Sequence, residues 1–245
     1  DRYSAEYRAE SQPDVIIGVD NWRDFVLCFG TSTIEYFSLT GASTTPGAAI
    51  YQSQPSMIVQ KGIAGTYCKT KYADTHAIIS HTATGSHSVY IVSSGSVQQI
   101  ATASVEKILQ SYSFAELASG VMESVRFESH ELLVIHMPRH VLVFDASVTD
   151  TGAQWSILKT GLFDQAHRSV DFIYEGNQIT CADKNMPVTG YLNSSISSQY
   201  GEQQEHLLYT PLFKADNARA FDFELESTTG VTQLAEKMSV SATTD

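Results

Sequence analysis

The chain has 245 residues, and its 42% hydrophobic and 17% charged content is typical of an ordered globular protein. Twenty-seven acidic residues against fifteen basic ones give a net charge of −12, and no apolar run is long enough to span a membrane. The negative charge disfavours a protein that grips nucleic acid through its phosphates.

The strand candidates form groups that repeat along the chain. In the first group, the strand candidate VIIGVDNW (15–22) precedes the hairpin candidate FVLCFGTSTIEYFSL (25–39). The same order returns three times: TYCKTKYAD (66–74) with AIISHTATGSHSVYIV (77–92), VMESVRFES (121–129) with HELLVIHMPRHVLVFD (130–145), and RSVDFIYEG (168–176) with NQITCADKNMPVTGYL (177–192). A further strand is predicted after two of the hairpins, at 97–104 and 154–162. Groups of three or four antiparallel strands that recur about every 50 residues indicate propeller blades.

One segment has a helical pattern instead. In SVEKILQSYSFAELASG (104–120), apolar residues recur at the spacing of one helix face, at Val105, Ile108, Leu109 and Tyr112. Ser113, followed three residues later by Glu116, predicts a capping box. We therefore expect one or two short helices in a connection between blades.

The hairpin at 130–145 contains three histidines, a glutamate and an aspartate, which raises the question of a metal site. Pro138 favours a tight two-residue turn that places His136 and His140 on opposite faces of the sheet. His130 shares a face with His136 but lies about 20 Å away, at roughly 3.3 Å per residue. Zinc–ligand bonds of about 2 Å cannot span that separation. We predict an ordinary hairpin here, unless a bulge or a longer loop changes the register.

The middle strands of the groups carry apolar residues on both faces, as in LLVIHM (132–137) and HVLVFD (140–145). A strand between two neighbouring blades needs this pattern, whereas a sheet with one wet face alternates more cleanly. We therefore predict an all-β, propeller-like fold of three- to four-stranded antiparallel blades, with a β-sandwich as the alternative. About four units are expected over residues 1–205. Residues 206–245 are predicted to form a fifth unit or the start of a truncated C-terminal β module.

The remaining candidate ligands indicate no metal or cofactor. His76, His81 and His87, with Asp74 nearby, could bind a metal, but exposed turn histidines are the commoner explanation. Four polar residues fit ordinary turns with too few oxygen ligands for calcium: Asp183, Asn185, Asp216 and Asn217. GIAGTYCK (62–69) lacks the spacing of a phosphate-binding glycine loop. Three separated cysteines, Cys28, Cys68 and Cys181, favour buried thiols in a reducing compartment over a disulfide framework.

One local motif suggests an alternative function. VTDTGAQW (148–155) resembles the Asp-box hairpin of sialidase-type propellers, with Asp150, Gly152 and Trp155 in the expected places. Its role is structural, and a sialidase also needs an arginine cluster and a tyrosine nucleophile with a glutamate partner. The arginines show no such placement: Arg23, Arg126, Arg139, Arg168 and Arg219. We therefore predict no catalytic residues, and keep a glycan-active or glycan-binding propeller as the alternative.

Long runs of the chain resemble a family of phage proteins. The runs are DRYSAEYRAESQPD (1–14), TSTIEYFSLTGA (31–42), VQKGIAGTYCKT (59–70), PRHVLVFDAS (138–147), VDFIYEGNQITCADK (170–184), SSQYGEQQEHLLYTPLFKADNARAFDFELES (197–227) and SATTD (241–245). They are similar to the packaged-DNA stabilisation protein, or tail accessory factor, of short-tailed phages of enteric bacteria. The similarity covers essentially the whole chain and matches the interior of a longer protein, so we expect an interior fragment.

The resemblance implies a structural, non-enzymatic hub in the virion tail, assembled in the cytoplasm of the host bacterium. It implies a hexameric ring below the portal and head-to-tail adaptor, which closes the DNA channel, stabilises packaged DNA and anchors the tail needle and tailspikes. DNA would pass nearby without being held tightly, in keeping with the acidic balance, and no membrane partner is implied. We assign no interface residue, but expect residues 1–12 or the last unit to help seal the assembly.

Overall fold

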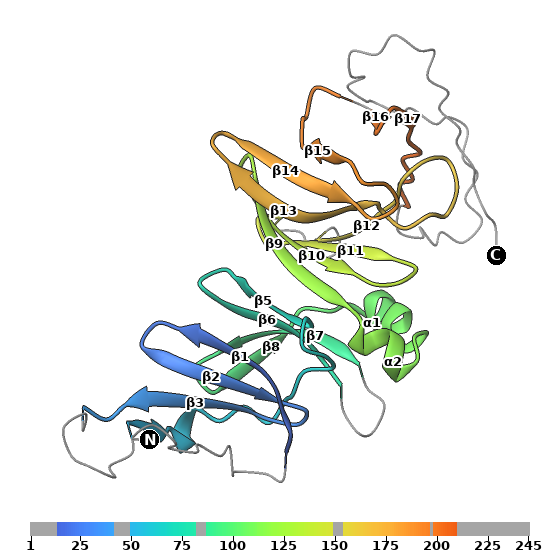
Figure 1. Ribbon diagram of the computed structural model, residues 1–245. Coiled ribbons are helices and arrows are strands. Elements are labelled where there is room, and N and C mark those ends of the chain that lie inside the picture. Colours follow the sequence, from blue (N-terminus) through green and yellow to red (C-terminus); the bar gives the residue numbers. More distant parts are fainter. Residues whose placement is uncertain (1–13, 42–49, 82–86, 149–153, 197, 210–245) are drawn as a thin grey trace, which may run out of the picture.

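The computed structural model describes residues 14–41, 50–81, 87–148, 154–196 and 198–209, and most of their regular elements are β-strands. Consecutive strands form four antiparallel sheets, termed blades 1 to 4 (Figure 1). Blade 1 contains β1 (Ile16–Trp22), β2 (Phe25–Gly30), β3 (Ile34–Leu39) and β4 (Tyr51–Ser53), and blade 2 contains β5 (Lys69–Tyr72), β6 (Thr75–Ser80), β7 (Ser88–Ser93) and β8 (Ser96–Gln99). Blade 3 contains β9 (Val121–Phe127), β10 (His130–His136), β11 (Val141–Asp145) and β12 (Trp155–Leu158), and blade 4 contains β13 (Ser169–Glu175), β14 (Gln178–Asp183) and β15 (Thr189–Tyr191). A two-stranded ribbon of β16 (Ser198–Gln199) and β17 (Glu202–Gln203) follows.

The predicted groups of strands are confirmed, with two differences in the fourth strands. Strand β4 was not predicted, because it has only three residues and two of them are polar. The strand predicted at 97–104 ends at Gln99. It stops there because the side chain of Thr102 accepts a hydrogen bond from the backbone N–H of Val105 and so caps a helix.

Two helices connect blade 2 to blade 3, as the sequence predicts. They are α1 (Ala103–Gln110) and α2 (Phe114–Ala118), and a single turn of 3-10 helix, η1 (Pro55–Met57), lies in the connection after blade 1. The predicted capping box is present, because the Ser113 side chain accepts from the Glu116 N–H while the Glu116 carboxylate accepts from the Ser113 N–H. Helix α1 buries Val105 and Leu109 against the blades.

The middle strands bury both of their faces. On β6, Ile78 belongs to the core between blades 1 and 2, whereas its neighbour Ile79 belongs to the core between blades 2 and 3. On β10, Leu133 likewise faces blade 2, and Val134 faces blade 4. Each fully buried aliphatic side chain contributes about 1.5–3 kcal/mol, so the blades stabilise one another. The predicted two-sided pattern of these strands is confirmed.

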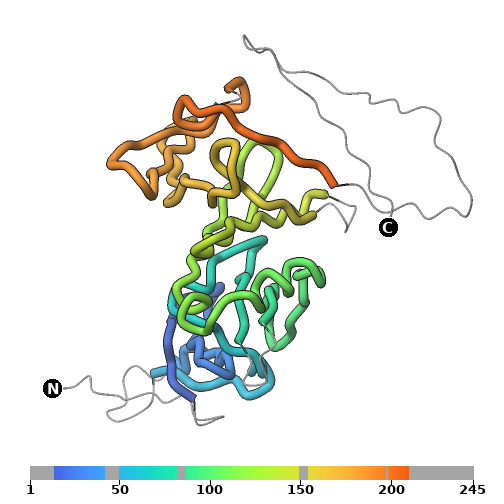
Figure 2. The backbone as a smooth tube through the Cα atoms, turned by 90° about the vertical axis from the view of Figure 1, so that its right-hand side faces the viewer, coloured from blue at the N-terminus to red at the C-terminus, as the bar shows by residue number. Residues whose placement is uncertain are grey.

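The blades form a series in chain order, not a pair of facing sheets. Blade 1 and blade 4 lie at opposite ends of the row in two views at right angles (Figures 1 and 2). The first strands of neighbouring blades contact one another, β5 with β9 and β9 with β13, and so line one edge of the row. This arrangement is that of propeller blades, and the β-sandwich alternative is not observed.

The connector between blades 1 and 2 runs very close to the backbones around it. The N–H of Ile63 donates to the carbonyl of Gly30 over 3.0 Å, and the N–H of Ala64 donates to that of Ile79 over 3.0 Å. A Cβ atom on Gly62 would lie 2.1 Å from the carbonyl carbon of Thr31, and one on Gly65 would lie 2.1 Å from the carbonyl oxygen of Ala118. The glycines of segment 62–69 are therefore required for packing.

Truncation of two adjacent residues on β6 tests the two-sided burial. Ile78→Ala and Ile79→Ala should each lower the free energy of unfolding by about 2–5 kcal/mol, because both side chains are 0% exposed. Val97→Ala on β8, where the side chain is exposed, should change it by about 0.5 kcal/mol or less. Chemical denaturation measures all three. A sheet with one wet face would show a large loss for only one of the two isoleucines.

Candidate functional site

A half-buried carboxylate lies at each of the three interfaces between the described blades. Between blades 1 and 2 it is Asp20 on β1, whose Oδ2 lies 3.3 Å from His76 Nε2 and 3.5 Å from Lys69 Nζ. Lys71 Nζ lies 3.5 Å from its Oδ1. Burial raises the pKa of Asp20, but the N–H of Asn21 and the charge of Lys69 more than offset this and hold the pKa below its ordinary value. The ionised carboxylate thus joins β1 to two strands of blade 2.

His76 is a core residue and not an exposed turn histidine. It is 1% exposed and its ring lies against that of Phe29, with the ring centres 5.4 Å apart. Burial lowers the pKa of His76, so the imidazole is neutral at neutral pH. The prediction of exposed turn histidines is wrong for His87 as well, because His87 is buried and its Nδ1 lies 3.1 Å from His81 Nδ1. In the part of the chain that the structure describes, no three His, Cys, Asp or Glu side chains converge to hold a metal ion.

Glu131 on β10 joins blades 2 and 3. Its Oε1 accepts a hydrogen bond from the N–H of Ala73 over 3.1 Å, and its Oε2 accepts one from Arg126 over 3.1 Å. The hydroxyl of Tyr72 donates to the Glu131 carbonyl over 3.0 Å and accepts from the N–H of Ala146 over 3.3 Å. The turn between β5 and β6 is therefore held against two strands of blade 3.

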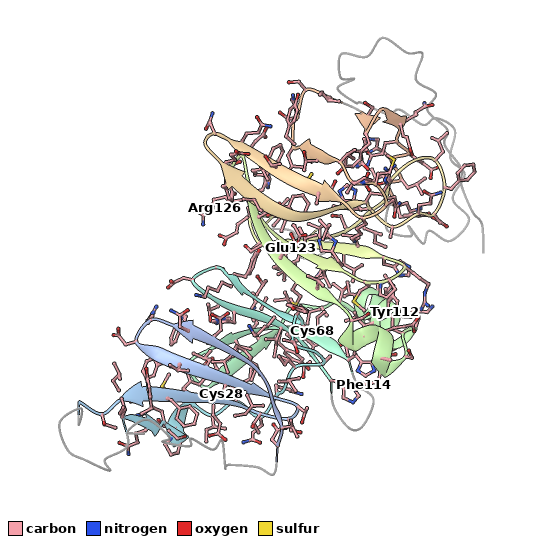
Figure 3. All side chains as sticks on the ribbon, in the orientation of Figure 1. Cys28, Cys68, Tyr112, Phe114, Glu123 and Arg126 are labelled. Atoms are coloured by element: carbon pink, nitrogen blue, oxygen red, sulfur yellow. The ribbon has the colours of Figure 1, made fainter. Side chains whose placement is uncertain are left out.

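Glu123 on β9 joins blades 3 and 4, at the junction visible in Figure 3. Its two oxygens accept hydrogen bonds from the N–H groups of Asp171 and Phe172, each over 3.0 Å. These two residues lie in a bulge of β13, where the register with β14 shifts and the strand ladder leaves their N–H groups without partners. Burial raises the pKa of Glu123, but hydrogen bonds from His136 and from these N–H groups hold it below its ordinary value.

The hairpin at 130–145 has the predicted register. The N–H of Met137 donates to the carbonyl of His140 over 2.8 Å, and His136 pairs with Val141. The three histidines have separate partners. His130 Nδ1 lies 2.7 Å from an Asp145 carboxylate oxygen, His136 Nδ1 lies 3.0 Å from Lys184 Nζ, and His140 Nδ1 lies 2.6 Å from the Tyr112 hydroxyl. They form three networks and not one site.

Arg168 and Asp183 form a buried, two-pronged ion pair at the base of blade 4. Arg168 Nε donates to Asp183 Oδ1 over 3.2 Å, a second guanidinium nitrogen donates to Oδ2, and a third donates to Glu202 over 3.0 Å. The interpretation of Asp183 as an ordinary turn former is thus incomplete. It does accept from the N–H of Asn185 over 2.8 Å, as a turn residue would, but its main partner is Arg168.

The other described arginines pair with different carboxylates at different places. The pairs are Arg23 with Asp74, Arg126 with Glu131, and Arg139 with Glu116. Within the described part of the chain, they do not form the cluster that a sialidase would need. Trp155 packs on Phe144 and donates from its indole to the Ile100 carbonyl over 2.8 Å. Arg219 and the Asp-box residues Asp150 and Gly152 lie outside the described residues, as do Asp216 and Asn217.

The cysteines are free thiols, and two of the three are buried as predicted. Burial raises the pKa of Cys68 to about 12, so this thiol stays protonated. Its sulfur lies 3.3 Å from the carbonyl of Leu117 in the core between blades 2 and 3. Cys181 is buried and Cys28 is half-buried.

The sequence interpretation missed the carboxylates at the interfaces and the ion pair in blade 4. The available signal was a charged residue inside a strand pattern, as at Asp20 in VIIGVDNW and Glu123 in VMESVRFES. Such residues are costly to bury without partners. Their partners come from other blades, so sequence spacing does not identify them.

Most of the chain matches a family of phage proteins. A family model described as "Bacteriophage P22 Gp10, beta-propeller" matches residues 1–197. The chain belongs to this family. Within it, the tail hub protein gp10 of Salmonella phage P22 is 68% identical over 245 residues, which is 100% of this chain and 52% of that protein. The chain therefore spans about half the length of this relative. The resemblance and the all-β propeller-like fold predicted from the sequence are confirmed, and no helix in the described residues is long and apolar enough to cross a membrane.

Replacing the carboxylate between blades 3 and 4 should destabilise the protein in a pH-dependent way. Glu123→Gln is expected to cost about 1–3 kcal/mol at neutral pH, because two backbone donors lose a charged acceptor. The pKa of Glu123 in the folded protein lies below its ordinary value of 4.5. Its contribution is therefore fully present above that pH and is lost as the pH falls through the lowered pKa.

Denaturation curves recorded over a range of pH check this expectation. The difference between wild type and Glu123→Gln should shrink as the solution becomes more acidic than about pH 4.5. Glu175→Gln, at an exposed residue of the same interface region, serves as the control and should have little effect. A cost for Glu123→Gln that stays constant down to strongly acidic pH would contradict the role assigned to its charge.

Proposed function

We propose that this chain is a structural module of a phage tail hub and has no enzymatic activity. The observation that carries the proposal is its 68% identity, over its whole length, to the tail hub protein gp10 of Salmonella phage P22. Because the chain spans 52% of that protein, the role concerns the hub as a whole, to which this chain contributes its blades. The place of action is then the tail of the virion.

The proposed partners are those that the family resemblance implies. The hub forms a ring, of six copies, below the portal and head-to-tail adaptor, closes the DNA channel, and anchors the tail needle and tailspikes. The blade interfaces support such a role physically. Each combines an apolar core with a carboxylate that bonds across the interface, which holds the blades together as a scaffold for partners.

The charge distribution supports a protein that DNA passes without being held. The turns between the first two strands of the blades lie on the same side, at the left in Figure 1, and an exposed acidic residue lies in each of the first three turns and directly before the fourth. These residues are Asp24, Asp74, Glu128 and Glu175. Arg23 of the first turn offsets part of this charge through its ion pair with Asp74, but the remaining carboxylates and the net charge of −12 disfavour tight binding of DNA.

The division of the chain into units stays a prediction. The four blades account for residues 16–191. Residues 206–245 are proposed as a fifth unit or the start of a C-terminal β module, and most of them lie outside the described residues. The same holds for residues 1–12, which we propose to help seal the assembly.

A chimera tests the hub function. The segment of gp10 that matches this chain is replaced by the chain itself in phage P22, and plaque formation and retention of packaged DNA are measured. We expect infectious virions that keep their DNA, because the replaced segment is 68% identical over its 245 residues. A soluble chimera whose heads assemble but lose their DNA would contradict the proposal.

Two variants of the chimera test whether the phage needs a correctly folded chain at this position or would form plaques with any inserted chain. Glu123→Arg places a cation against the N–H groups that Glu123 accepts, and should abolish plaques by opening the interface between blades 3 and 4. Glu175→Arg, at the exposed end of β13, should leave the plaque count within about tenfold of the parent chimera.

The alternative glycan function is tested directly on the purified chain. Incubation with fluorogenic sialosides and other glycosides should give no turnover above a heat-treated control, because the described arginines are dispersed in separate ion pairs. A glycan array should give no reproducible binding. Turnover or saturable binding would assign a glycan-directed activity to the chain.

A further inference from the structure

A cavity of about 560 Å³ lies between blades 3 and 4. One side is formed by the end of β10 and the turn after it, and the other by residues that flank β13 and β14. The lining includes four basic residues and three polar ones, namely His136, His167, Arg168 and Lys184, with Ser119, Gln165 and Asn185. A basic lining is unusual in this chain, whose net charge is −12.

Most of the basic groups at the cavity carry no free charge. The guanidinium of Arg168 is neutralised by Asp183 and Glu202. His167, which also lines the cavity, is neutral, because burial lowers its pKa to about 4. The charge of the cavity therefore comes from Lys184.

Lys184 lacks a counter-ion among the described residues, whose ion pairs do not include it. The residue as a whole is exposed, and its ammonium group lies 3.0 Å from His136 Nδ1 and 3.5 Å from the His167 carbonyl. These two contacts use two of its three N–H groups. Burial lowers the pKa of Lys184 more than the charges of Glu123 and Asp171 raise it, so the cation is partly withdrawn from water and these carboxylates compensate for that only in part.

His136 separates Lys184 from the nearest interface carboxylate. The side chain of His136 is 4% exposed, and its Nδ1 accepts from the ammonium, so its proton is on Nε2. That nitrogen lies 3.3 Å from Glu123 Oε1, and the same carboxylate also accepts from two backbone N–H groups of β13. Glu123 therefore already accepts hydrogen bonds from His136 and β13. The ammonium of Lys184, at the cavity, keeps one N–H group that can donate to a ligand.

We propose that the cavity between blades 3 and 4 binds a small oxyanion, a phosphate or a carboxylate group, on the ammonium of Lys184. Gln165 and Asn185 line the same space and carry side-chain amides that can donate further hydrogen bonds, whereas the Ser119 hydroxyl already donates to the Glu116 carbonyl over 2.7 Å. A charge-assisted hydrogen bond of this kind is short and strong because one partner is a full charge. The anion would also hold blade 4 against blade 3, since residues of both blades line the cavity.

Anion binding to the complete 245-residue chain tests the proposal. Inorganic phosphate and succinate are titrated separately, by calorimetry and as increments in melting temperature, against sodium chloride of equal ionic strength. At least one of the two should bind and raise the melting temperature, and the comparison shows whether a phosphate or a carboxylate is preferred. Lys184→Met should weaken that binding by about tenfold or more, and Lys184→Arg should restore part of it.

Two controls keep the outcome decisive. Lys107→Met, at an exposed lysine of α1, should bind the anion as the wild type does. In buffer without phosphate or carboxylate, Lys184→Met should melt no lower than the wild type, because it removes a partly buried cation that Glu123 and Asp171 compensate only in part. Binding that Lys184→Met leaves unchanged, or no response to either anion beyond that to chloride, would overturn the proposal.

Discussion

The structure depends on one constraint, which is that the central strands of each inner blade are apolar on both faces. A sheet of this kind cannot stand alone in water, because whichever face is left open exposes several large aliphatic side chains. Leu133 and Val134, neighbours on β10, pack into different cores on opposite sides of the sheet. Stability is therefore shared between blades, and each interface supports the next.

Polar contacts supply what the apolar cores cannot, namely a fixed registration between blades. Apolar packing is non-directional, whereas hydrogen bonds have defined geometry. Asp20, Glu131 and Glu123 each bond across one interface, and two of them accept backbone N–H groups of the neighbouring blade. At the bulge in β13, the carboxylate completes hydrogen bonding that the strand ladder omits. Such contacts specify one alignment of the blades among the many that packing alone would allow.

The local features of the fold could be predicted from the sequence, and the contacts between blades could not. Pro138 identifies its turn because proline sets the backbone angle within one residue. Ser113 and Glu116 identify the start of α2 because the two residues of a capping box lie only three positions apart in the sequence. A partner within one blade can also escape prediction: Asp183 has a turn-forming neighbourhood, and its buried partner Arg168 directly precedes β13. His76 has the sequence setting of a turn residue but completes a core with Phe29, 47 positions earlier.

The glycines at 62 and 65 give the fold a fixed dimension. At both positions the main chain of the connector touches other main chain, first at Thr31 after β2 and then at Ala118 at the end of α2. Side chains can exchange rotamers to absorb a change in volume, but peptide groups in contact cannot. Contact between main-chain atoms therefore sets the distance from blade 1 to the helices α1 and α2. A methyl group added at either glycine would force these main chains apart and so displace the blades on both sides of the connector.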